Sequence, residues 1–128
     1  MKISKKAEYG LLAMVHLAKN KNKQAISIRE ISNNESMPFE FLSKIFADLE
    51  RANLVTAKHG ANGGYYLAKL AKQITAGDVV EILEGRIAPA NCAFCGKSKK
   101  CTSKNVWTKV DTAIEKTLKN ITLADLIK

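Results

Sequence analysis

The apolar positions of residues 4–19 recur every three or four residues, which is the period of an amphipathic helix. These positions are Ala7, Leu11, Met14, Val15 and Ala18. Ser4 precedes them and can accept a hydrogen bond from a free backbone amide as an N-cap. In residues 27–36, Ser27 stands three positions before Glu30, the spacing of a capping box, so this segment predicts a second, short helix.

From residue 38 onward the pattern predicts a third helix and a hairpin. Pro38 stands at the expected first helical position, where its missing amide costs nothing. One face of the following helix carries Leu42, Ile45, Phe46 and Leu49. Residues 54–58 and 65–69 are typical of two strands, and the turn HGANGG between them has the glycines that a tight hairpin needs. Helix, short helix, helix, hairpin is the order of a winged helix-turn-helix, so the fold expected is mainly α with a small β-hairpin wing.

Two further helices and a short one complete the pattern. Thr75 and Asp78 can cap a helix over residues 75–85, which Gly85 would end. From Lys104 a long helix carries an apolar stripe that a domain of this size would not cover alone. We expect a partner helix, related by a two-fold axis, to cover the stripe and make the protein a homodimer. The contact residues would be Trp107, Val110, Ile114 and Leu118. Thr122 then caps a last short helix, residues 123–128.

These elements divide the chain into three parts. Residues 1–85 form the winged helix-turn-helix DNA-binding domain, residues 86–103 a loop with all the cysteines, and residues 104–128 the dimerisation helix with the short C-terminal helix. The 128 residues and 46% apolar content suit one globular domain. No apolar run approaches the ~20 residues of a membrane span, and the N-terminus lacks a signal-peptide core, so we expect a cytoplasmic protein.

The charge is strongly basic and unevenly spread. The formal net charge is +9, and residues 1–74 carry twelve Lys or Arg against six Asp or Glu. A basic surface attracts anionic partners, and binding to nucleic acid gains free energy from counterion release. Double-stranded DNA with paired half-sites is the partner that this balance and the predicted fold favour together, although a lysine-rich surface alone is also compatible with simple solvation.

The predicted fold indicates which residues would touch DNA. The second helix of the helix-turn-helix pair presents its N-terminal residues to base edges in the major groove. The residues concerned are Phe39, Glu40, Ser43 and Lys44, of which Lys44, together with Arg29, could equally contact phosphate. At the hairpin turn, Lys58, His59 and Gly60 could approach the backbone or the minor groove. The alternatives are a solvated helix face and an exposed turn.

Three cysteines stand in the segment NCAFCGKSKKC: Cys92, Cys95 and Cys101. In the cytoplasm structural disulfides are disfavoured, so an odd number of thiols this close together indicates a metal, an iron-sulfur cluster or redox chemistry. Three thiolates are one short of the four ligands that zinc or a cluster usually takes. His16 and His59 are the only histidines, and the carboxylates are the other candidates for the fourth ligand.

The sequence closely resembles the Rrf-type family of bacterial winged-helix transcription regulators, which includes IscR-like and NsrR-like iron-sulfur sensors. The resemblance covers nearly the whole chain. It is carried by KKAEYGLLAMVHLA, FLSKIFADLERANLV, HGANGGYYLA, TAGDVVEILEG, the three-cysteine loop and VWTKVDTAIEKTLKNITLADLI.

The resemblance implies a homodimer that holds one iron-sulfur cluster per subunit, with the state of the cluster altering the affinity for DNA. In members whose fourth ligand is a carboxylate, it comes from the first helix of the partner subunit, and Glu8 occupies that position here. Other members use a histidine three residues after the last cysteine, where this chain has Lys104. The spacing Cys-x2-Cys-x5-Cys is shorter than is common in the family, which leaves both [4Fe-4S] and [2Fe-2S] open. His59 replaces a usual arginine of the wing.

Two other functions are compatible with the same sequence features. A zinc-dependent or thiol-redox regulator could use the same DNA-binding body, and a small cluster-carrying electron-transfer protein could use the basic surface for docking. An enzyme is not expected, because the sequence has no nucleophile-base pair, carboxylate dyad or phosphate-cradling glycine loop placed for catalysis.

Overall fold

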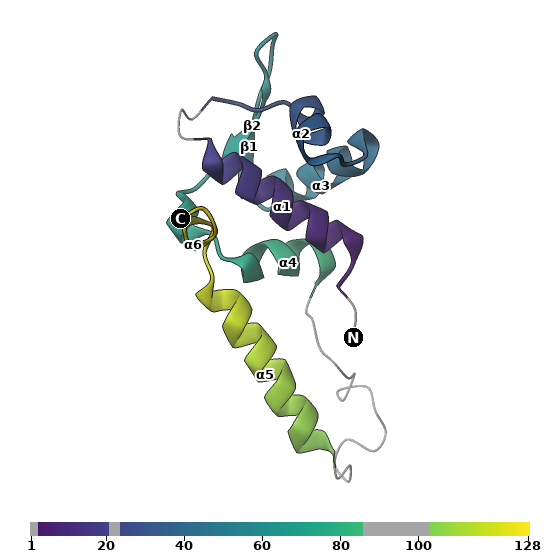
Figure 1. Ribbon diagram of the computed structural model, residues 1–128, viewed down its shortest axis with the longest axis vertical. Coiled ribbons are helices and arrows are strands. Elements are labelled where there is room, and N and C mark those ends of the chain that lie inside the picture. Colours follow the sequence, from purple (N-terminus) through teal and green to yellow (C-terminus); the bar gives the residue numbers. More distant parts are fainter. Residues whose placement is uncertain (1–2, 21–23, 86–102) are drawn as a thin grey trace.

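Helix α1 (Lys5–Lys19) lies at the centre of the fold, and most other elements pack around it (Figure 1). The computed structural model describes residues 3–20, 24–85 and 103–128. Within these ranges, the neighbours of α1 are α2 (Ile28–Glu35), α3 (Phe39–Arg51), α4 (Ala76–Glu84), α6 (Leu123–Leu126) and strand β2 (Gly64–Leu67). The side of α1 that meets them is apolar, since Ala13 and Met14 are fully buried.

The expected winged helix-turn-helix is confirmed. The order α2, α3, β1 (Val55–Lys58) and β2 is that of the sequence prediction, and α3 buries the predicted face of Leu42, Ile45, Phe46 and Leu49. Two caps differ in detail. Ser27 accepts from the amide of Glu30 at 3.1 Å, which is only half of a capping box. Pro38 is the N-cap of α3 rather than its first helical residue.

The wing is a two-stranded antiparallel hairpin whose register runs from Val55–Leu67 to Lys58–Gly64. A third segment pairs with it, because the amides and carbonyls of Ile26 and Tyr65 exchange two hydrogen bonds of 2.9 Å. Gly64 permits this approach, since a Cβ at that position would lie 2.3 Å from the carbonyl oxygen of Ile26. Strand β1 begins one residue later than predicted. Strand β2 begins one residue earlier than predicted and ends at Leu67 rather than at Lys69.

Helix α4 has the predicted capping box. Thr75 accepts from the amide of Asp78, and Asp78 accepts from the amide of Thr75, both at 3.0 Å. Gly85 ends the helix with a φ of 84°, in the left-handed region that favours glycine. The short 3-10 helix η1 (Ala71–Gln73) lies between the wing and α4.

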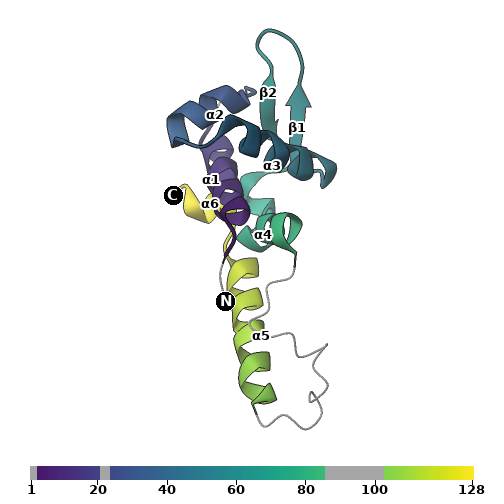
Figure 2. The same cartoon turned by 90° about the vertical axis from the view of Figure 1, so that its right-hand side faces the viewer.

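Helix α5 (Lys104–Asn120) extends away from the body, at the end of the molecule opposite the wing (Figure 2). Its C-terminal part contacts α4, and the chain then returns to the body through α6. There Leu123 is fully buried in the same core as α1, and its amide donates to the carbonyl of Ile74 at 2.9 Å. Thr122 caps α6, as predicted, in a reciprocal box with Asp125. None of the helices in the described ranges is long and apolar enough to cross a membrane.

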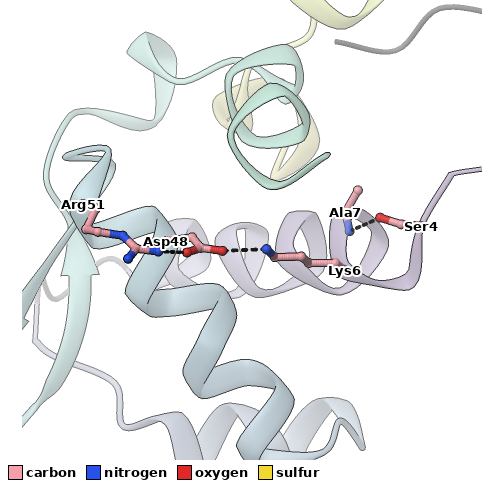
Figure 3. A network of polar contacts seen from close by, with 5 residues as sticks. All are labelled: Ser4, Lys6, Ala7, Asp48 and Arg51. Atoms are coloured by element: carbon pink, nitrogen blue, oxygen red, sulfur yellow. Dashed lines mark hydrogen bonds and ion pairs between the residues drawn. The ribbon is translucent and has the colours of Figure 1, made fainter. Parts of the chain in front are cut away.

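The first turn of α1 is bound to two other helices by polar contacts. Lys6 Nζ lies 2.6 Å from Asp48 Oδ2 on α3, and Arg51 pairs with the other oxygen of the same carboxylate (Figure 3). Ser4, the N-cap of α1, accepts from the amide of Ala7, and its own amide donates to Glu84 Oε1 of α4 at 3.0 Å. The start of α1 is therefore fixed relative to both α3 and α4.

The ion pair between Lys6 of α1 and Asp48 of α3 is electrostatically favourable in the folded protein. The hydrogen bond from Lys6 holds the pKa of Asp48 below its ordinary value of 3.8, and the charges of Lys6 and Arg51 act in the same direction against the opposing effect of partial burial. A carboxylate with a lowered folded pKa contributes stability that is present above its unfolded pKa and is lost as the pH falls through its folded pKa.

We predict that Lys6→Met lowers the free energy of unfolding at pH 7 by about 0.5–1 kcal/mol, the upper range for ion pairs of this exposure. The difference from wild type should shrink as the pH falls below the ordinary pKa of 3.8, because Asp48 becomes protonated first in the unfolded chain and, at lower pH, in the folded protein. Urea unfolding at a series of pH values measures this. Lys5→Met is the matched control, since Lys5 pairs with Glu8 at 3.2 Å on the open surface and should contribute much less. Equal losses in the two variants would contradict the prediction.

Candidate nucleic-acid interface

The exposed face of α3 carries the residues expected to meet DNA. Phe39, Glu40 and Lys44 are exposed, and Ser43 is half-buried beside them. Ser43 Oγ donates to the carbonyl of Phe39 at 3.1 Å, so its proton is used within the helix and its oxygen remains an acceptor. The acidic Glu40 in the first turn is stabilised by the positive end of the helix dipole.

Arg29 of α2 contacts the start of α3, the second helix of the helix-turn-helix pair. Its guanidinium carbon lies 4.8 Å from the centroid of the Phe39 ring, which is the geometry of a cation–π contact. The Arg29 side chain is exposed and makes no hydrogen bond or ion pair with another side chain in the described ranges. Both residues were expected at the interface from the sequence, but their contact was not, because they lie on different helices and no spacing rule connects them.

The tip of the wing presents the other predicted residues. Lys58, His59 and Gly60 are exposed, and Gly60 has a φ of 108° in the turn. The amide of Gly63 donates to the carbonyl of Gly60 at 3.0 Å, which closes the turn. Figures 1 and 2 place the wing, α2 and α3 at one end of the molecule, opposite to α5. The basic residues of all three elements therefore lie at the same end.

The predicted cluster ligands are only partly within the described residues. Cys92, Cys95 and Cys101 belong to residues 86–102, which lie outside them. Glu8 is in the first turn of α1, with 47% of its side chain exposed and Lys5 as its ion-pair partner. In the ranges that the structure describes, no three histidine, cysteine or acidic side chains gather as a metal site.

The two histidines have separate surroundings. His16 Nδ1 lies 3.0 Å from Glu35 Oε1, a contact that joins α1 to α2. His59 is in the turn of the wing. His16 therefore lies beside one other potential ligand, Glu35, but neither histidine belongs to a group of three potential metal ligands among the described residues.

The predicted dimerisation residues lie along α5, which has no fully buried residue in the single chain. Trp107 is 39% exposed, while Val110, Ile114 and Leu118 are half-buried. Ile114 and Leu118 line a pocket against Gly77 and Val80 of α4. Contacts within the chain thus cover the C-terminal part of the stripe and leave the tryptophan end open to solvent.

Sequence reasoning missed the contacts that hold α1 in place. The Lys6–Asp48 ion pair and the bond from the Ser4 amide to Glu84 join residues far apart in the chain. No local pattern marks such pairs, because they depend on the angles at which α1 crosses α3 and α4.

Comparison with known proteins agrees with this architecture. A family described as "Rrf2: Iron-dependent Transcriptional regulator" matches residues 3–128. The protein rrf2 of Nitratidesulfovibrio vulgaris is 32% identical, with 100% of this chain and 88% of the relative aligned. The HTH-type transcriptional regulator CymR of Bacillus subtilis is 33% identical, over 98% of this chain and 89% of the relative.

Solved structures show the same fold. The structure of CymR, described as the global cysteine regulator of B. subtilis, superposes with a TM-score of 0.89 at 32% identity and covers 99% of this chain and 96% of its own. The IscR of T. potens gives a TM-score of 0.83 at 34% identity, over 99% of this chain and 86% of its own. The relatives are named as regulators, which agrees with the expectation that the protein is not an enzyme. The chain belongs to the Rrf2 family of transcriptional regulators.

Proposed function

We propose that this regulator binds operator DNA as a homodimer through α3 and the wing, and that an iron-sulfur cluster held by Cys92, Cys95, Cys101 and Glu8 controls the binding. The observation that carries the proposal is the combination, in one Rrf2-family chain, of an exposed basic winged helix with three cysteines between α4 and α5. The iron dependence in the family description supports the same reading.

The donor set suits such a group. Thiolates are the usual ligands of iron-sulfur clusters, and a carboxylate is a weaker ligand that is more easily exchanged. The Glu8 carboxylate is accessible, and its surface ion pair with Lys5 costs little to break. It is therefore free to turn toward a ligand without disturbing the core. When bound, the cluster, [4Fe-4S] or [2Fe-2S], would supply a centre that responds to oxygen, nitric oxide or redox state.

The position of Glu8 provides a route from the ligand site to DNA. It lies in the same turn of α1 as Lys6, which pairs with Asp48 on the recognition helix. Tyr9, one residue further, contacts Phe41 of α3 edge to face at 5.6 Å between ring centroids. A displacement of this turn would therefore act directly on α3, which is the type of local change that can bias a regulator between two states.

The open stripe of α5 supports the homodimer. An exposed tryptophan beside Val106, which is 54% exposed, is an apolar surface of the kind that interfaces cover. A two-fold dimer would place two α3 helices for paired half-sites about one turn of DNA apart. In this proposal residues 1–85 bind DNA, residues 86–103 hold the cluster and residues 104–128 carry the dimer contact. The last part is not separate from the first, because Leu123 packs in the core of the DNA-binding body.

A second candidate function is a regulator that responds through its thiols alone. The observation that favours it is the similarity to CymR, which is described as a global cysteine regulator. The two candidates differ in the iron and sulfide content that they predict for the purified protein. In the first case, protein purified without oxygen should contain iron and acid-labile sulfide. In the second it should contain neither, and reversible thiol oxidation should change DNA binding.

We predict that Lys44→Ala weakens operator binding and reduces the dependence of log Kd on log salt by about one unit per half-site, because one phosphate contact is lost. Fluorescence anisotropy at several salt concentrations measures both quantities. Lys72→Ala makes the same charge change on η1, away from α3, and should leave the salt slope unchanged. If the two variants behave alike, Lys44 does not contact phosphate.

We also predict that each of the three Cys→Ala changes abolishes cluster assembly, whereas Glu8→Ala allows assembly but shortens the lifetime of the cluster and alters its circular dichroism. The expected difference arises because a carboxylate contributes less to binding than a thiolate. The measurements are iron and sulfide content and visible spectra after reconstitution without oxygen. Glu30→Ala is the control, since Glu30 is also an exposed glutamate in the first turn of a helix. A wild-type spectrum and lifetime for Glu8→Ala would exclude Glu8 as a ligand.

A further inference from the structure

Phe39 is an exposed aromatic side chain at the first position of the recognition helix. It is 40% exposed and does not belong to the hydrophobic core, whereas its neighbour Phe41 packs against the core and contacts Tyr9. The fold therefore does not require the apolar ring of Phe39. An apolar ring at the N-terminus of a recognition helix is placed where side chains reach base edges.

The Phe39 ring has an ordering contact from the neighbouring helix α2. The guanidinium of Arg29 lies over the ring, 4.8 Å from its centroid. The hydroxyl of Ser43 donates to the backbone carbonyl of Phe39 at 3.1 Å, so it does not contact the ring. A side chain that is already ordered loses less conformational entropy when it binds.

The chemistry of the ring limits what it can recognise. A phenyl group neither donates nor accepts conventional hydrogen bonds, so it cannot read the polar pattern of a base edge. The only apolar group that the major groove presents is the C5-methyl of thymine. Arg29, whose guanidinium carbon lies over the ring, still has N–H donors that could contact a neighbouring phosphate.

We infer that Phe39 reads a thymine methyl group in each operator half-site and that Arg29 positions the ring for this contact. The inference rests on the proposed DNA-binding function and adds the base, and the chemical group on that base, that Phe39 would recognise. Phe39 is the specificity-determining residue, and Arg29 is a positioning residue that also contacts the DNA backbone.

The test uses the operator duplex defined by footprinting with the whole, cluster-loaded protein. Each thymine of a half-site is replaced in turn by deoxyuridine, which removes the methyl and leaves the hydrogen-bonding groups unchanged. For the wild type, one position per half-site should weaken binding roughly fourfold, the effect of burying one methyl group. Phe39→Ala should bind the thymine and uracil duplexes equally.

Two further variants separate reading from general affinity. Lys44→Ala should bind both duplexes more weakly and keep their ratio. Arg29→Lys keeps the charge but not the planar guanidinium that lies over the ring, so it should reduce the ratio while leaving the salt dependence close to that of wild type.

Specific binding by the wild type with no effect of uracil at any position would overturn the inference and leave the proposed function standing. If Phe39→Ala still binds the thymine duplex more tightly than the uracil duplex, the inference is likewise overturned and the proposed function stands. If the wild type binds no duplex with sequence specificity, the proposed function fails, and this inference fails with it.

Discussion

At Gly10, helix α1 has no side chain, and Leu83 of α4 occupies the space. A Cβ at this position would lie 2.0 Å from Leu83 Cδ1 and 3.5 Å from Ile45 of α3. A glycine inside a helix costs up to about 1 kcal/mol relative to alanine, so its presence here is explained by the close approach of three helices. Because α1 also supports α2, α6 and the wing, the angle set at this contact determines how the remaining elements can pack.

The Gly10 contact also couples the proposed ligand Glu8 to α3. The same stretch of α1 that packs on α4 carries Lys6, which binds the recognition helix, and Glu8, which we propose as a cluster ligand. Tight packing around Gly10 allows little independent movement of the first two turns, since the buried side chains are close-packed. A force applied at Glu8 is therefore transmitted to α3 and α4 together rather than absorbed locally.

The sequence predicted the parts of the fold that depend on local rules. Helix periodicity identified the buried face of α3, and the capping box of Thr75 with Asp78 formed as expected. The box at Ser27 formed only in part, because spacing shows which bonds are possible and not which side chains turn inward. Contacts between helices, such as Lys6 with Asp48 and Arg29 with Phe39, could not be predicted, since they require the crossing geometry. The candidate DNA-contact and cluster residues could be predicted mainly from residue types and from the family resemblance.

The return of the chain through α6 has a consequence for how the protein folds. Leu123 is fully buried in one core with residues of α1, so the first and last helices of the described chain complete the same structure. Contacts between such distant parts of a chain form late and slow the overall reaction. During synthesis, the α1–α4 body must therefore wait with part of its apolar surface uncovered until residue 123 has left the ribosome. In that interval a chaperone, or a second nascent chain, can reach the pocket that Leu123 later fills.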